Sequence, residues 1–121
     1  MKKLILFVLL IVTTMMNVVA QNRNINFEQT KEWKKIIKKA KKENKLIFVD
    51  CYTSWCGPCK ILSRNVFTND AVADFFNAHF INAKFDMEKD RDGVILKKQF
   101  GIRFFPTLVF VDPVSGEVLH R

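Results

Sequence analysis

The chain contains few of the residues that form disulfides or bind metals, with three cysteines and two histidines among 121 residues. Three cysteines are too few for a miniprotein that is held together by disulfides. A zinc site would need four ligands from these five residues, and neither His79 nor His120 has the spacing of a paired ligand. We therefore expect neither class of protein. Internal repeats and low-complexity segments are also absent from the sequence, and twelve phenylalanines allow one small domain to bury a core.

The first twenty residues have the pattern of a secretory signal. Lys2 and Lys3 precede an apolar run over 4–12, and the segment ends at Ala20 before a polar stretch. We predict a cleaved signal peptide over 1–20, with an uncleaved membrane anchor as the alternative. No cysteine follows the predicted cleavage point, so a lipid-modified N-terminus is not expected. The protein should then lie outside the cytoplasm, periplasmic or secreted.

Basic residues are concentrated at the start of the mature chain. Removal of Lys2 and Lys3 lowers the formal charge from +8 to +6, and much of the remainder lies over 31–42. In this segment apolar residues recur at helical spacing, which predicts an amphipathic helix with a solvated basic face. Weak contact with an anionic membrane, or with an acidic partner, is the alternative interpretation, and nucleic acid is not an expected partner.

The remaining sequence alternates between strand and helix patterns. We predict a linker over 21–29 and one domain over 30–121. Its helices are predicted at 31–42, 57–66, 71–79 and 94–100, and its strands at 46–51, 80–86, 107–111 and 117–120. Such alternation is typical of an α/β sandwich around a mixed sheet.

The most informative motif is Trp55-Cys56-Gly57-Pro58-Cys59, which follows the apolar strand at 46–51. Two cysteines three apart can close a small disulfide. If the pair opens a helix, the helix dipole stabilises the thiolate of the first cysteine. A strand, a short loop and CxxC at a helix start distinguish a redox pair from half of a metal site. The motif therefore predicts dithiol–disulfide exchange.

The sequence around this motif resembles the thioredoxin family over about residues 30 to 121. Asp50 lies six residues before Cys56, as the buried acid of the family does. Lys84 falls where the strand lysine of the family pairs with that acid, and Pro106 with Thr107 matches the segment that carries the cis-proline. The resemblance implies a three-layer sandwich with a central mixed β-sheet. The chain stops at Arg121, as the fourth strand forms, so we expect a domain that lacks the family's final helix.

The resemblance also implies roles for the residues of the motif. Cys56 would be the exposed nucleophile, and the more deeply buried Cys59 would resolve the mixed disulfide. Asp50 would accept the proton of Cys59, its pKa raised by burial and moderated by Lys84. No cofactor is implied beyond the redox-active Cys56–Cys59 disulfide.

Other residues are implied to contact the substrate. These are Trp55, Gly57, Pro58, Phe105 and Pro106. Common thioredoxins have smaller residues where this chain has Phe104 and Phe105, and at least one of these rings is expected to pack into the core. Cys51 is interpreted as a buried inert thiol, with a third redox cysteine as the alternative.

Three functions remain open. The first is a periplasmic protein-disulfide reductase that receives electrons from a membrane thiol:disulfide reductase and passes them to disulfide-containing client proteins. The second is a thiol oxidase or disulfide isomerase of the same fold. The third is a peptide-binding or holdase module without turnover.

Overall fold

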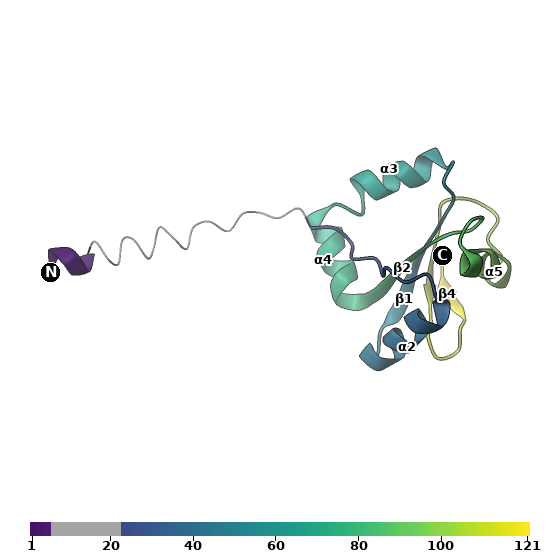
Figure 1. Ribbon diagram of the computed structural model, residues 1–121, viewed down its shortest axis with the longest axis horizontal. Helices are drawn as coiled ribbons and strands as arrows, with labels where there is room; N and C mark the ends of the chain where they lie inside the picture. Colours follow the sequence, from purple (N-terminus) through teal and green to yellow (C-terminus); the bar gives the residue numbers. More distant parts are fainter. Residues whose placement is uncertain (6–22) are drawn as a thin grey trace.

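The computed structural model describes residues 1–5 and 23–121, in which helices and strands alternate (Figure 1). The helices are α2 (Trp33–Glu43), α3 (Gly57–Asn65), α4 (Asp70–His79) and α5 (Arg91–Gln99), and the strands are β1 (Leu46–Tyr52), β2 (Phe80–Asp86), β3 (Thr107–Val111) and β4 (Val118–His120). Each element predicted over 31–120 is present. Residues 6–20 of the predicted signal lie outside the described residues.

The largest boundary difference is at α5, which begins at Arg91 instead of Val94. The sequence pattern predicts no helix over the charged residues before Val94. In the structure, Asp86 and Asp90 close a tight turn, because the Asp90 carboxylate accepts a hydrogen bond from the Asp86 N–H at 2.8 Å. This turn leads directly into the helix. At the other end Gly101 follows α5 with a φ of +63°, a backbone conformation that favours glycine.

The four strands form one mixed sheet in the order β2-β1-β3-β4. Strand β1 runs parallel to β2, with Asp50 opposite Lys84, and antiparallel to β3, with Asp50 opposite Leu108. Strand β4 is antiparallel to β3. The predicted mixed sheet is confirmed, and β1, which carries Asp50, lies inside it with a partner on each side.

Helices cover both faces of the sheet, which gives three layers (Figure 1). Ile47, Val49 and Cys51 point from β1 into the core that contains α2 and α5. Residues between them in sequence point to the opposite face, because side chains alternate along a strand. Helix α2 buries Ile36 and Ala40, so the apolar face predicted for this helix is confirmed and is occupied by the core.

Phenylalanines dominate the second core, on the face of α3 and α4. The Phe48 ring lies 4.8 Å from that of Phe76 and 5.3 Å from that of Phe110, between ring centroids. Ile25 and Phe27 pack into the same core, and Ile25 is only 5% exposed. These two residues lie in the segment predicted as a linker over 21–29. Where the structure describes this segment, it packs against the domain and differs from a free linker.

A short irregular segment separates α3 from α4, between the two predicted helices at 57–66 and 71–79. The Asn69 side chain accepts a hydrogen bond from the Val72 N–H at 3.2 Å and so caps α4. Among the described residues, no helix is both long enough and apolar enough to cross a membrane.

Candidate active site

Cys56 and Cys59 lie where β1 leads into the first turn of α3. Their sulfurs form a disulfide, with the Cα atoms 5.3 Å apart. Cys56 is the N-cap residue of α3, and its Sγ accepts a hydrogen bond from the Cys59 N–H at 3.2 Å. Pro58 falls in the first turn, where a backbone N–H has no partner inside the helix. The first sulfur therefore lies at the positive end of the helix dipole, which favours a thiolate once the disulfide opens.

The two cysteines are equally buried, each with 3% of its surface exposed. The expectation of an exposed Cys56 and a more buried Cys59 is therefore wrong for the disulfide form. The Sγ atom of Cys56 is bonded to Cys59 and contacts the backbone of α3, so it is turned towards the helix. Gly57 and Pro58 between the cysteines are exposed. A Cβ at Gly57 would have no neighbour within 4 Å, so the surface beside it is open.

Asp50 is a buried carboxyl in the middle of the sheet, only 1% exposed. Its Oδ1 has no hydrogen-bond partner among the described protein groups. Burial raises the pKa of this carboxyl to about 6, although the positive charges of Lys84 and Lys31 act in the opposite direction. The direction expected from the sequence, raised by burial and moderated by Lys84, agrees with this result. At neutral pH the group is poised to accept a proton.

Lys84 lies opposite Asp50 in the register of β1 and β2, yet the two side chains form no ion pair in the described part of the chain. The Lys84 ammonium instead lies 4.9 Å from the Tyr52 ring and 5.3 Å from the Phe27 ring, measured to the ring centroids. Aromatic faces attract a cation at such distances. The implied pairing with Asp50 is thus corrected: Lys84 acts on the carboxyl through its charge and not through a direct contact.

A second lysine near this acid was missed from the sequence. The Lys31 Nζ donates a hydrogen bond to the Lys84 carbonyl oxygen at 2.5 Å and lies 5.6 Å from the centre of the Phe85 ring. Burial lowers the pKa of Lys31, and its charge lowers that of Asp50. No sequence signal marks this lysine, because it is one of many in the basic segment over 31–42.

A cleft of about 220 Å³ opens beside Cys59. Cys59 and Lys84, the register partner of Asp50, line the same cleft. The other lining residues are Tyr52, Thr53, Ser54, Lys60, Ser63 and Arg64. Thr53 is 1% exposed, and its hydroxyl has no partner among the described protein groups. The cleft thus joins the second cysteine to a mainly apolar surface that carries the positive charges of Lys60, Arg64 and Lys84, with room for several water molecules.

Aromatic side chains form a rim on another side of the disulfide. Trp55 is 67% exposed, its Nε1 donates a hydrogen bond to Glu88 at 2.9 Å, and its ring lies edge-on to Phe105 at 6.0 Å between centroids. Phe105 packs partly against the core, whereas Phe104 is 79% exposed. The expectation that at least one of these two rings packs inward is therefore met by Phe105. The peptide bond between Phe105 and Pro106 is cis.

Cys51 and the histidines lie apart from the disulfide. Cys51 is a fully buried free thiol on the opposite face of β1 from Asp50, and burial raises its pKa to about 12. The Nδ1 atom of His79, at the end of α4, lies 2.8 Å from the Phe75 carbonyl oxygen, and His120 lies in β4.

Glu88 is a second residue of the site that was missed from the sequence. Its carboxylate accepts the hydrogen bond of Trp55, and this contact depends on the position of the loop after β2.

Comparison with known proteins gives the thioredoxin-like family, in agreement with the resemblance seen in the sequence. A family model named Thioredox_DsbH, described as a protein of unknown function (DUF255), matches residues 16–99. Thioredoxin H4 of Arabidopsis thaliana is 35% identical over 89 residues, which cover 74% of this chain and 68% of the relative.

Solved structures are similar in fold as well. A proposed disulphide-isomerase from Bacteroides thetaiotaomicron is 50% identical, with a TM-score of 0.71, over 84% of this chain and 81% of that one. A DsbH oxidoreductase has the same TM-score of 0.71 at 21% identity, over 87% of this chain and 77% of that one, and shows the fold alone. The resemblance stated from the sequence is thereby confirmed. The chain belongs to the thioredoxin-like family and is a thioredoxin-like thiol–disulfide oxidoreductase whose redox pair is Cys56 and Cys59.

Proposed function

We propose that this protein reduces disulfides of client proteins outside the cytoplasm, by cycling Cys56 and Cys59 between dithiol and disulfide. One observation supports the proposal above the others: the disulfide caps α3 in a domain that also buries Asp50 with a raised pKa. A helix N-terminus favours the thiolate needed for attack, and a buried carboxyl of pKa about 6 can take up the proton of a second thiol.

The first half-reaction joins enzyme and client. The Cys56 thiolate attacks one sulfur of the client disulfide, a new S–S bond forms, and the other client sulfur leaves as a thiolate. This direction fits the position of Cys56 at the N-cap of α3, where the negative charge is stabilised.

The second half-reaction releases the client. Cys59 loses its proton, Asp50 being the proposed acceptor, and its thiolate attacks the Cys56 sulfur. The mixed disulfide breaks, the Cys56–Cys59 bond forms, and the second client sulfur leaves as a thiolate that takes up a proton. The enzyme dithiol has then given two electrons to the client disulfide. The cleft beside Cys59 and Lys84 supports this assignment, because it gives water access to the resolving thiol.

Turnover requires a source of electrons outside the protein. We propose a membrane thiol:disulfide reductase, whose dithiol would reopen the Cys56–Cys59 bond and become a disulfide in turn. The location outside the cytoplasm is supported by the signal-like pattern over 1–20. Trp55, Phe105 and Pro106 are proposed to contact the client, with Gly57 and Pro58 forming the open surface over the disulfide.

Disulfide isomerisation is the second candidate, favoured by the 50% identity to the proposed disulphide-isomerase from Bacteroides thetaiotaomicron. The reduction potential of the Cys56–Cys59 pair separates the candidates, measured by equilibration with glutathione and with a thioredoxin standard. A value near −270 mV would support the reductase, since reducing members of the fold lie at about that value. A value near about −180 mV, together with recovery of activity from a scrambled disulfide protein, would support the isomerase. A value near about −120 mV would make the protein an oxidant and would overturn the proposed direction.

A further inference from the structure

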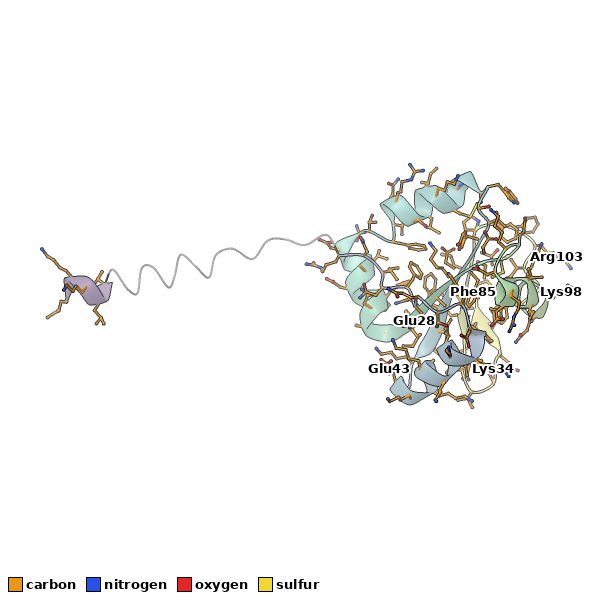
Figure 2. All side chains as sticks on the ribbon, viewed as in Figure 1. Glu28, Lys34, Glu43, Phe85, Lys98 and Arg103 are labelled. Atoms are coloured by element: carbon orange, nitrogen blue, oxygen red, sulfur yellow. A yellow bond between two sulfur atoms is a disulfide. The ribbon has the colours of Figure 1, made fainter. Side chains whose placement is uncertain are left out.

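A hollow of about 470 Å³ lies on the outer side of the aromatic rim, between α5 and the segment that precedes Pro106. Met87, Val94 and Ile102 give it an apolar lining. Lys97, Lys98 and Arg103 supply positive charge, and Glu88 is the acidic residue of the lining. Figure 2 shows Lys98 and Arg103 at the same edge of the molecule, beside α5.

Two contacts connect this hollow to the disulfide. Glu88 accepts the hydrogen bond of Trp55, the residue next to Cys56, so its carboxylate is already engaged. Lys97 reaches from α5 to the Phe105 ring, 5.6 Å from its centroid, and Phe105 lies 6.0 Å from Trp55. These two distances place the Lys97 ammonium at most about 12 Å from the centroid of the Trp55 ring, a length that an extended chain covers in roughly four residues. Trp55 is the sequence neighbour of Cys56, so a client that crosses both rings would reach Lys97 with a side chain about that many residues from its reactive cysteine.

The charges of the hollow are not matched within the described chain. None of Lys97, Lys98 and Arg103 lies within ion-pair distance of a carboxylate in residues 1–5 and 23–121. The lining carries the three positive charges of these residues against the one negative charge of Glu88, so the hollow presents net positive charge beside apolar side chains. A ligand that fits would bring a negative group on a short aliphatic stem.

We propose that this hollow selects clients that carry a glutamate or aspartate about three or four residues from the reactive cysteine. The acidic group would meet Lys97 and Arg103, its methylenes would lie on Val94, which is 40% exposed, and the client backbone would cross Phe105. The inference depends on the proposed exchange activity and adds the sequence class of client. Charge complementarity of this kind determines partner choice and association rate more than overall affinity.

The test uses two synthetic disulfide peptides that differ only in having Glu or Lys four residues from the reactive cysteine. The second-order rate constant for their reduction by the reduced protein is measured at low salt. We expect the Glu peptide to react about threefold to tenfold faster, with the ratio falling towards one as salt is raised. In the double variant Lys97→Glu, Arg103→Glu the ratio should invert. A matched variant, Lys41→Glu, Lys42→Glu, changes the charge equally at the end of α2 that precedes β1, and should keep the wild-type ratio.

The outcomes separate this inference from the proposed function. Reduction of the neutral hydroxyethyl disulfide by the wild-type protein establishes exchange activity without any side chain for the hollow to bind. If that reduction proceeds and the two peptides react equally, the hollow does not select clients and the inference is overturned. If the variant Lys41→Glu, Lys42→Glu changes the ratio as much as the variant Lys97→Glu, Arg103→Glu, selection comes from net charge and the hollow has no part in it. If hydroxyethyl disulfide is not reduced at all, the proposed function fails first.

Discussion

The two sides of the disulfide depart from the usual distribution of side chains in opposite ways. Behind it, in the middle of the sheet, a carboxyl is 1% exposed, and in front of it Phe104 and Trp55 are 79% and 67% exposed. Charged groups are normally on the surface, and large rings are usually at least partly buried. A buried carboxyl costs stability and an exposed ring costs solubility, so neither arrangement is expected from folding alone.

The difference assigns separate tasks to the two sides. On the interior side, Asp50 and the charges of Lys84 and Lys31 can set the pKa of the proton acceptor and the reduction potential of the Cys56–Cys59 pair, whichever client disulfide is bound. The rim, with Trp55 and Phe105, can determine which client disulfides bind. Substitutions on the interior side should therefore change pKa values, potentials and stability, whereas substitutions on the rim should change the ratio between clients.

The largest effect is expected at the cysteines themselves. Replacement Cys56→Ser should lower the exchange rate at least about a thousandfold, because the attacking thiolate is lost. Replacement Cys59→Ser should stop turnover and leave a client covalently attached to Cys56, visible as a band on a non-reducing gel. Because both cysteines are 3% exposed, burial does not distinguish these roles, and this pair of variants does. An adduct that forms on Cys56→Ser and not on Cys59→Ser would reverse the assignment.

The next effect is on stability, at Asp50. Its pKa is raised from 3.8 to about 6 in the folded protein, so between these values the folded state binds more protons than the unfolded state. Stability therefore falls as pH rises from about 4 to about 6, and the ionised carboxyl costs up to about 3 kcal/mol at pH 7. Replacement Asp50→Asn should raise the free energy of unfolding at pH 7 by up to that amount and remove this pH dependence.

Denaturant unfolding of the oxidised protein at several pH values measures this directly. Asp74→Asn is the control, because the Asp74 carboxylate is exposed and pairs with Arg23 at 2.8 Å. In this variant the free energy of unfolding should change by less than about 1 kcal/mol. The Asp50 variant should also slow the resolution of the mixed disulfide. A variant that is less stable than the wild type at pH 7 would show that the carboxyl is held by contacts stronger than its burial cost.

A smaller effect should separate the two lysines that act on Asp50. Replacement by methionine at Lys84 or Lys31 removes a positive charge, so the pKa of Asp50 should rise above about 6 in both variants. Lys84 should have the larger effect, because its charge contributes more than that of Lys31. The Asp50 carboxyl can be titrated by NMR with labelled aspartate. Lys39→Met serves as the control, because Lys39 pairs with Glu28 instead of acting on Asp50. An equal shift in the control would attribute the effect to net charge.

The sequence predicted the order of elements and the residues of the redox pair, because these depend on local signals. Apolar runs indicated β1 and β2, and CxxC followed a buried strand. The resemblance to thioredoxins then identified Asp50 and Lys84, which lie far apart in sequence and opposite each other in the sheet.

The contacts that could not be predicted are those set by tertiary packing. Lys31 is one of many similar lysines, and only the approach of the segment before α2 to β2 brings it to the Lys84 carbonyl. Lys84 turned towards two rings instead of the carboxyl, because Tyr52 and Phe27 flank it in three dimensions. The hollow beside α5 depends in the same way on the position of a helix relative to the loop before Pro106.

The smallest effect is expected at Cys51, one residue from Asp50 and on the opposite face of β1. This thiol is fully buried and its pKa is raised to about 12, first by burial and then by the charge of Asp50, so it should not take part in exchange. Replacement Cys51→Ala should cost about 1 kcal/mol of unfolding free energy, through a small cavity, and leave the reduction potential unchanged. Val49→Ala, on the same face of β1, provides a scale for cavity costs in this core. A changed potential, or a client adduct on Cys51 when Cys56 and Cys59 are both replaced by serine, would make it a third redox cysteine and would extend the redox chemistry to the core of α2 and α5.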